Sequence, residues 1–460
     1  MDKSIIRSKR DVPSVEITAS DENISKAGAG LPRPLLIEII RTAVEKVKLD
    51  LGNSPDGIEY STFLEKVIRD IRKENRRRLA RVINGTGILI HTNLGRAPLS
   101  ETLFEKIKEQ NTGYSNLEFD ITTGKRGRRG EMAEKYLTLL SEAEAGCIVN
   151  NNAAALFLIL NTLAHKKNVI VSRGELVQIG GGFRIPDILR KSGARLIEVG
   201  TTNITTINDY SSALEENPAL ILKVHQSNFA LKGFTEDADI KALAALGRKH
   251  NCPVIHDLGS GVFVDTSEFT GQREPNVQTS VREGVDLTCF SGDKLLGGVQ
   301  AGLIVGKKEL IDRLKKNPVY RALRVDKIVF AALETMLGYY LDNDWRDNIK
   351  LWTLAGRPEA EMYDIGRKML KEITAGDKII LEGSKAEMGG GSLPEITIPS
   401  VALVFRSKLS PQKTAALFLS SEPPVIGRVS QDFFMIDLKA IDESDIIKLT
   451  SIIKNLKDSL

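Results

Sequence analysis

Lys294 is the side chain of this sequence whose surroundings best suit covalent catalysis. It lies in the stretch SGDKLLGG at positions 291–298, directly after a predicted strand at Leu287–Phe290. A lysine amine forms an imine with a carbonyl group, and glycines let a bulky ligand come close to the backbone. Ser291 could donate a hydrogen bond to a phosphate of that ligand. A surface lysine after a strand would give the same pattern, so this stretch alone leaves both interpretations open.

Asp257 favours the interpretation with a bound cofactor. It closes a predicted strand at Val254–His256 and precedes Lys294 by 37 residues. A carboxylate at a strand end can pair with a protonated pyridine nitrogen, which keeps the ring of pyridoxal phosphate able to accept electrons from a substrate carbanion. An aspartate that only caps a turn is the common alternative. The two strand ends together predict a pyridoxal-phosphate enzyme with Lys294 as its reactive amine.

Further polar groups follow two other predicted strands. Asn152 and Ala153 open an alanine-rich helix after the strand Cys147–Val149, and the free N–H groups of a helix N-terminus bind phosphate well. A plain helix cap would use the same asparagine. His225 follows the strand Ala219–Val224 and could lie against the cofactor ring, although a histidine satisfied within the core is an equal alternative.

Three arginines could bind an anion. Arg321 and Arg324 are three residues apart, so on a helix they would share a face and could clamp an oxyanion. Arg96 ends the turn-like segment HTNLGR at 91–96. Taken alone, the pair Arg321 and Arg324 favours a solvated helix face, and Arg96 has the same ambiguity.

These residues must be positioned by a sheet, because short β-rich runs alternate with helical runs between residues 145 and 330. This alternation is typical of a mostly parallel sheet covered on both faces, which binds ligands beyond the carboxyl ends of its strands. The predicted strands are Cys147–Val149, Val169–Val171, Arg195–Val199, Ala219–Val224, Val254–His256, Leu287–Phe290 and Leu303–Val305.

The sequence predicts three domains. Residues 1–80 form a helical N-terminal domain with helices at Leu31–Asp50 and Ser61–Ala80, preceded by a polar segment whose end has a flexible-linker composition. Residues 81–330 form the large cofactor-binding domain. Residues 331–460 form a smaller α+β domain, with predicted strands at Val401–Phe405 and Phe433–Asp437 and predicted helices at Pro411–Leu419 and Glu443–Leu456.

Charge and composition restrict the partners. The net charge is only +4, but positions 66–81 carry eight basic against two acidic side chains, so a polyanionic partner is plausible. No apolar run approaches the ~18 residues that span a bilayer, and the start lacks the apolar core of a signal peptide, so we expect a cytoplasmic protein without membrane contact. The three cysteines are far apart, and we expect no metal site.

Taken together, these segments resemble the bacterial selenocysteine synthases, the L-seryl-tRNA(Sec) selenium transferases. The resemblance extends from about residue 80 to the end of the chain. It is carried by the segments at 82–87, 91–96, 148–155, 171–177, 183–187, 199–203, 257–261, 291–298, 321–324 and 424–428.

The resemblance implies an aspartate-aminotransferase-like fold, with pyridoxal 5'-phosphate on Lys294. It implies that Arg96, Arg321 and Arg324 surround a selenophosphate site and that Asp293 is an active-site residue. The implied reaction converts seryl-tRNA(Sec) to selenocysteinyl-tRNA(Sec), by β-elimination through aminoacrylyl-tRNA and then addition of selenium. The family also implies a homo-oligomeric ring of dimers, with ten subunits expected, and an N-terminal domain that binds the tRNA.

Three other functions remain open from the residues alone. A related pyridoxal-phosphate lyase for a free amino acid or amino sugar would not need the basic first domain. An RNA-binding protein that has lost catalysis would not need Lys294 and Asp257. A purely structural ring scaffold is the third alternative, and no feature of the sequence favours it.

Overall fold

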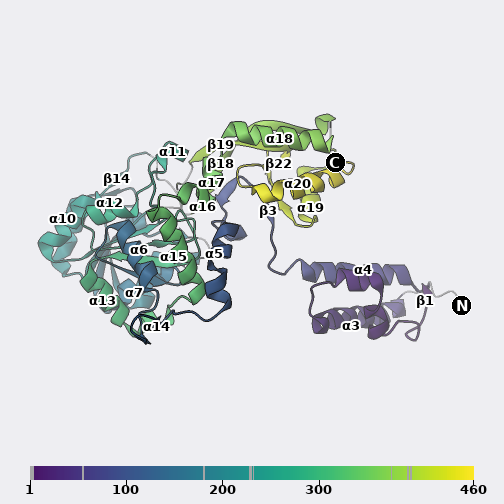
Figure 1. Ribbon diagram of the computed structural model, residues 1–460, viewed down its shortest axis with the longest axis horizontal. Helices are drawn as coiled ribbons and strands as arrows, with labels where there is room; N and C mark the ends of the chain where they lie inside the picture. The colour runs from purple at the N-terminus through teal and green to yellow at the C-terminus, as the bar shows by residue number, and fades with distance from the viewer. Residues whose placement is uncertain are drawn as a thin grey trace. The chain divides into compact units, whose positions relative to one another are not determined.

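Two compact units make up the chain in this computed structural model: Met1–Val82 and Ile83–Leu460 (Figure 1). The structure describes residues 5–53, 56–179, 182–226, 231, 233–374, 376–390, 393 and 396–460.

The first unit is a small helical bundle. Its long helices are α3 (Arg33–Asp50) and α4 (Tyr60–Asn75), as the sequence predicted. Phe63, Val67 and Ile71 recur at helical spacing on α4 and are fully buried, so this stripe forms the core against α3.

Two expectations for this unit were wrong. The predicted helix Ser61–Ala80 ends at Asn75, because no apolar side chain after Ile71 continues the buried stripe and the following arginines are exposed. The polar segment before residue 30 is also more ordered than its composition suggested. It contains the capped helices α1 (Val15–Ala19) and α2 (Glu22–Ala27), which are too short to show a periodic pattern.

The second unit is built on a seven-stranded sheet in the order β11-β8-β13-β15-β16-β17-β7. Every neighbouring pair is parallel except the two pairs that involve β17. The mostly parallel sheet and its seven predicted strands are therefore confirmed. The strands are β7 (Ala145–Val149), β8 (Asn168–Ser172), β11 (Arg195–Val199), β13 (Leu220–Val224), β15 (Val254–Gly259), β16 (Leu287–Ser291) and β17 (Gly302–Gly306).

Helices cover both faces of this sheet, and its side chains alternate between two separate cores. Ile148 packs in the core that holds α6 (Glu131–Ser141) and α15 (Lys327–Leu341). Its neighbours Cys147 and Val149 pack in the core that holds α7 (Asn152–Leu163) and α13 (Lys308–Lys316). This alternation is the period-two pattern of a strand buried on both faces.

A second, five-stranded sheet has the order β21-β22-β19-β18-β4. Its long strands β18 (Ile379–Gly389) and β19 (Thr397–Phe405) are antiparallel, and β18 also pairs in parallel with β4 (Ile88–Ile90). Two short strands pair beside it, β3 (Ile83–Asn84) and β20 (Val425–Ile426). Residues 83–90, which lie inside the segment 81–330, are thus hydrogen-bonded to the C-terminal strands.

The rest of the C-terminal segment completes this sheet and covers it. The elements are β21 (Arg428–Ser430), β22 (Phe433–Asp437), α18 (Glu359–Ile373), α19 (Pro411–Leu419) and α20 (Glu443–Leu456). The predicted strands and helices of this segment are confirmed.

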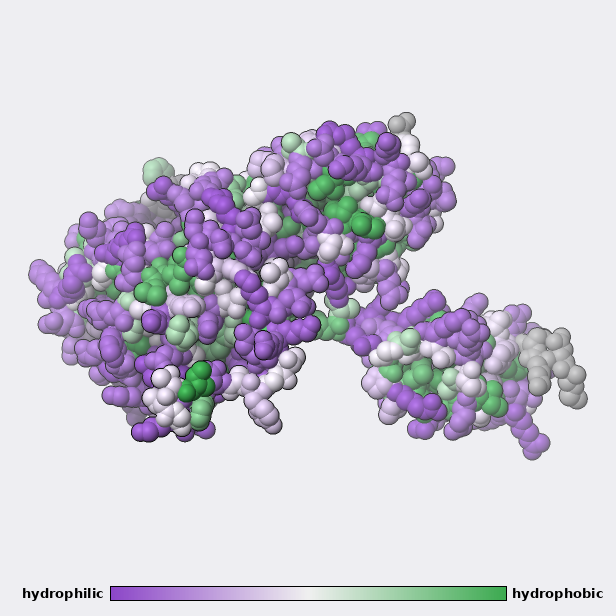
Figure 2. All heavy atoms as spheres, in the orientation of Figure 1, coloured by the Kyte–Doolittle hydropathy of each residue, from purple (hydrophilic) through white to green (hydrophobic). Residues whose placement is uncertain are grey.

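Hydrophilic side chains dominate the visible face of the second unit, where hydrophobic side chains form only small, separate groups (Figure 2). Among the described residues, no helix combines the length and apolarity that crossing a membrane requires.

Candidate cofactor and substrate site

Three neighbouring strands bring predicted site residues to one edge of the seven-stranded sheet. Strands β13, β15 and β16 are adjacent and parallel, so their carboxyl ends meet at the same edge. His225 follows β13, Asp257 lies near the end of β15, and Ser291 ends β16. The backbone N–H of His225 donates to the carbonyl of Asp257 at 2.8 Å.

Lys294 lies in a tight turn after β16 that only glycines allow. The N–H of Gly298 donates to the carbonyl of Gly292 at 2.8 Å. A Cβ at Gly292 would lie 2.5 Å from the carbonyl oxygen of Val299, and one at Gly298 would lie 3.0 Å from that of Gly292. The Leu295 N–H donates to the carbonyl of Ser260 at 2.9 Å, which fixes the turn to the loop after β15.

The Lys294 side chain is buried, with 7% of the residue exposed. Burial lowers the pKa of its amine and the nearby Arg96 adds to this effect, whereas Asp257, Asp293 and Glu274 oppose it. A lowered pKa increases the fraction of neutral amine, and the neutral amine is the form that attacks an aldehyde or removes a proton.

Asp257 is the charged partner of this amine. It is also buried, and burial raises the pKa of its carboxyl, although the hydrogen bond from Asn152 and the charge of Lys294 oppose the rise. The Asn152 side-chain amide donates to Asp257 at 2.8 Å, and the Gly259 N–H donates at 3.1 Å. These two donors fix the orientation of the carboxylate.

Asn152 reaches Asp257 because the start of α7 passes closely over β17. A Cβ at Gly302, the first residue of β17, would lie 2.1 Å from the carbonyl oxygen of Asn151, so this crossing requires glycine. Asn151 is the N-cap of α7 and accepts from the Ala154 N–H at 2.8 Å. The helix therefore begins at Asn152 and Ala153, and its N-terminus lies over the end of the sheet.

Two buried polar atoms at this edge have no partner among the described residues: Oδ1 of Asn152 and Oγ of Ser260. Unpaired buried polar atoms are uncommon in proteins. Together with a buried amine, a buried carboxyl and a helix N-terminus, they fit a polar ligand that carries an aldehyde and a phosphate, as pyridoxal phosphate does.

Arg96 is held beside Lys294 by Asp293. One guanidinium nitrogen of Arg96 lies 2.9 and 2.8 Å from the two carboxylate oxygens of Asp293. The N–H of Ala97 also donates to the Asp293 carbonyl at 3.2 Å. The Arg96 side chain keeps 36% of its surface exposed, so it can also contact a ligand.

The other two arginines lie near the start of α7 but not on one helix. Helix α14 (Pro318–Ala322) carries Arg321 and ends before Arg324. The condition under which both would share a helical face is therefore not met, because the chain leaves the helix at Leu323. The Leu323 carbonyl accepts from the Asn150 N–H at 3.0 Å, which joins this turn to the end of β7.

Glu118 is a further residue at this edge that the sequence did not single out. Its carboxylate accepts from Arg126 at 2.8 Å and from Arg129 at 3.0 Å, and it lies 3.7 Å from Arg324. The hydrogen bonds from Arg129 and Arg126 lower the pKa of Glu118, so it stays ionised and holds Arg324.

Glu274 is the second residue that sequence reasoning missed. It lies in the loop before helix α12 (Val277–Arg282) and is buried. One of its carboxylate oxygens lies 3.1 Å from Nε2 of His225, so it fixes the orientation of that ring. Its sequence signal is weak, because a glutamate in a polar loop is usually exposed.

The part of the chain that the structure describes contains no cluster of histidine, cysteine, aspartate or glutamate able to hold a metal ion.

The chain is similar to known proteins over most of its length. The family model described as L-seryl-tRNA selenium transferase matches residues 82–442. The L-seryl-tRNA(Sec) selenium transferase of Aquifex aeolicus (strain VF5) is 44% identical over 435 residues, which cover 93% of this chain and 95% of that protein. The protein of the same name from Alkaliphilus oremlandii (strain OhILAs) is 42% identical over 94% of each chain.

A solved structure shares the fold. The structure of D-glucosaminate-6-phosphate ammonia-lyase aligns with a TM-score of 0.59 at 18% identity, and covers 83% of this chain and 96% of that one. At this identity the likeness concerns the fold alone. The predicted aspartate-aminotransferase-like fold class is confirmed.

We predict that Lys294→Ala abolishes the visible absorbance that appears when the protein is mixed with pyridoxal phosphate, because burial lowers the pKa of the Lys294 amine. The buried Lys223 on the neighbouring strand β13 cannot replace it, since Lys223 pairs with Glu175 and Asp237, which raise its pKa. The matched control is Lys307→Ala. Lys307 also follows a strand of the same sheet, but its side chain is half-exposed and pairs with Asp286. An absorbance band that persists in Lys294→Ala would contradict the assignment.

We also predict that Glu274→Gln shifts imine formation to lower pH. Glu274 raises the pKa of Lys294, so its neutralisation lowers that pKa and the neutral amine becomes available at lower pH. The measurement is the rate of absorbance increase after apoprotein and pyridoxal phosphate are mixed, as a function of pH. Glu268→Gln, at an exposed ion pair with Arg346, should leave the profile unchanged. A shift to higher pH in Glu274→Gln would refute the electrostatic role.

Proposed function

This chain belongs to the L-seryl-tRNA selenium transferase family, and we propose that it converts seryl-tRNA(Sec) to selenocysteinyl-tRNA(Sec) with selenophosphate as the selenium donor. The observation that carries the proposal is the buried pair of Lys294 and Asp257 at the carboxyl edge of the sheet, in a chain that matches the family over most of its length.

Pyridoxal 5'-phosphate is the cofactor in this proposal. Lys294 would hold its aldehyde carbon, and Asp257, oriented by Asn152, would hold its ring nitrogen. Ser291 and the start of α7 at Asn152 and Ala153 would hold its phosphate, and His225 would lie against the ring. The bound cofactor supplies an electron sink for the substrate α-carbon.

The next steps of the proposal are removal of the substrate α-proton and loss of the serine β-hydroxyl. The Lys294 amine, when it is not bonded to the cofactor, would be placed to take the proton from the substrate α-carbon. Its lowered pKa suits this role, because the neutral amine is the base. The serine β-hydroxyl would leave as water, and the β-carbon would then bond to the selenium of the donor. A water molecule would take the phosphoryl group from selenium, so that the Se–P bond breaks and phosphate is released.

The arginines would hold the anionic selenium donor. Arg96 keeps an exposed guanidinium edge beside Asp293, and Arg321 is exposed on α14. Arg324 is tied to Glu118. Guanidinium groups suit a phosphate-like donor because they form forked, charge-assisted hydrogen bonds. Asp293 acts in this proposal as the active-site residue that orients Arg96.

Residues 1–80 would form the tRNA-binding domain. The buried stripe of α4 faces its own core, which leaves Arg69, Arg72, Lys73 and Arg76 exposed. Such a basic surface attracts a phosphate backbone through salt-sensitive contacts.

The assembly and location are also parts of the proposal. We expect a homo-oligomeric ring of dimers with ten subunits, in which neighbouring subunits complete each site around the exposed Arg321. We expect the reaction in the cytoplasm, where aminoacylated tRNA is used.

The direct test is to identify the reaction product. We predict that the purified holoprotein, incubated with seryl-tRNA(Sec) and selenophosphate, yields tRNA whose released amino acid is selenocysteine by mass spectrometry. The Lys294→Ala protein should return only serine. Recovery of serine alone from the unmodified protein, with its cofactor bound, would disprove the function.

A second test addresses the basic helix in the full chain. We predict that replacing Arg69 and Arg72 by glutamine weakens tRNA binding by about tenfold near physiological salt and reduces its salt dependence. Replacing Arg41 and Lys46, exposed on α3, removes the same charge and is the matched control. An equal loss of tRNA affinity in both double variants would show that only the net charge of the domain matters. That result would contradict a specific role of α4.

A further inference from the structure

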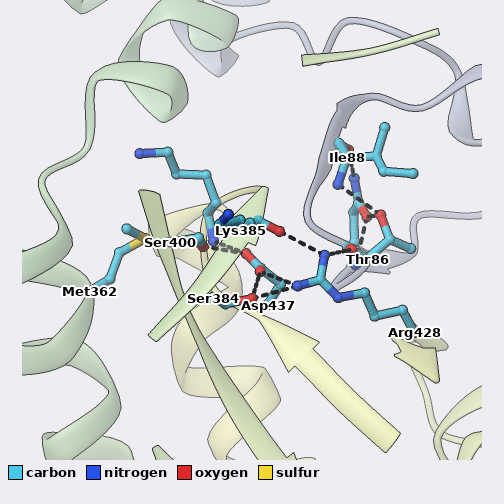
Figure 3. A network of polar contacts seen from close by, with 10 residues as sticks. Thr86, Ile88, Met362, Ser384, Lys385, Ser400, Arg428 and Asp437 are labelled. Carbon is cyan, nitrogen blue, oxygen red and sulfur yellow. Dashed lines mark hydrogen bonds and ion pairs between the residues drawn. The ribbon is translucent and has the colours of Figure 1, made fainter. Parts of the chain in front are cut away.

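A buried ionic network lies inside the C-terminal sheet, outside the site described above (Figure 3). Its centre is Asp437 at the end of β22, which is fully buried. The carboxylate accepts hydrogen bonds from Ser384 at 2.9 Å, from Ser400, and from the Lys439 N–H at 3.0 Å. Arg428 on β21 supplies the opposing charge at 3.1 Å. A buried carboxylate needs such compensation, because burial without a partner is strongly unfavourable.

Arg428 also holds the segment that enters the second unit. Its Nη1 donates to the carbonyl of Thr86 at 3.1 Å and to that of Lys385 at 3.0 Å. Gly87 makes this approach possible, since it has φ +81° and a Cβ there would lie 2.7 Å from the Arg428 guanidinium. The same cation therefore joins Asp437, β18 and the backbone just before β4.

The neighbouring bonds make this segment rigid. The Asp437 N–H donates to the Gly85 carbonyl, and the Glu387 N–H donates to the Gly87 carbonyl, both at 2.8 Å. Asn84 closes the turn internally, because its side chain accepts from Thr86 and donates to the Ile88 carbonyl.

Arg96 follows this segment after a single short turn. The carbonyl of His91, the residue after β4, accepts from the Arg96 N–H at 2.9 Å. Gly95 and Arg96 both have positive φ, 94° and 65°. Such a conformation is unfavourable for arginine and persists only where the surrounding structure imposes it. The position of β4 therefore determines where the Arg96 guanidinium meets Asp293.

We propose that Arg428 and Asp437 are positioning residues for the selenium-donor site, because they lock the segment 84–90 and thereby place Arg96 on Asp293 beside Lys294. The proposal rests on the proposed role of Arg96 in holding the donor. Neither residue touches the reacting atoms, so each acts through the backbone between Thr86 and Arg96.

A double-mutant cycle tests the proposal in the full holoprotein. We expect Arg428→Gln to lower kcat/KM for the selenium donor by about tenfold, through KM more than kcat, while cofactor absorbance and tRNA affinity stay unchanged. In a protein that already carries Arg96→Lys, adding Arg428→Gln should lower kcat/KM by less than about twofold. The guanidinium group that Arg428 positions is absent from that protein, so its misplacement has no further effect. Equal factors in both backgrounds would overturn the proposal.

Amide hydrogen exchange provides a readout that does not depend on activity. Peptides covering residues 91–97 should exchange faster in Arg428→Gln than in the unmodified protein. Unchanged exchange there would also overturn the proposal. If the unmodified protein gave no selenocysteine product, the proposed function would be refuted. The exchange measurement would still show whether Arg428 fixes the position of residues 91–97.

Two further variants protect the test against a folding failure. Asp437→Asn keeps the side-chain shape but removes the charge that Arg428 faces, and it should reproduce the effect of Arg428→Gln in milder form. Arg367→Gln removes an exposed arginine of α18 that pairs with Asp364, and it should change neither the donor kinetics nor the exchange of residues 91–97.

Discussion

The Lys294 amine and the Asp257 carboxyl group are both buried at one edge of the large sheet. Burying ionisable groups is unfavourable, and the surrounding residues of the second unit supply the hydrogen bonds and charges that offset this cost. Burial lowers the pKa of Lys294 and raises that of Asp257, so each group depends on fixed partners for its reactive state. Asn152 and the Gly259 N–H supply those partners for the carboxyl. Gly292 and Gly298 allow the tight turn around Lys294, and Gly302 lets the start of α7 pass closely over β17.

Much of this edge could be predicted because it depends on local patterns. Each strand of the large sheet is a short apolar run, and parallel strands bring the residues that follow them to a common edge. The sequence alone therefore predicts that Lys294, Asp257 and Asn152 lie near one another. The hydrogen bond between Asn152 and Asp257 could not be predicted from the sequence, because it depends on the crossing of α7 over Gly302.

Other features depend on contacts between distant residues. Glu274 and Glu118 lie in loops, and their importance comes from His225 and Arg324, which are far away in sequence. Helices α1 and α2 form because of side-chain caps at Ser14 and Asp21 and because Ile24 is buried in a core shared with α3 and α4. Periodicity does not reveal elements of five or six residues, since they complete fewer than two helical turns.

The pairing of residues 83–90 with strands β18 and β20 has a consequence for how the protein matures on the ribosome. The N-terminal helical bundle has all its core residues before position 72, so it can fold early in synthesis. The partners of the segment that leads to Arg96 are made only at positions 379–437. A nascent chain therefore completes the proposed tRNA-binding domain long before its catalytic centre, and under that proposal truncated products would sequester the tRNA without converting it.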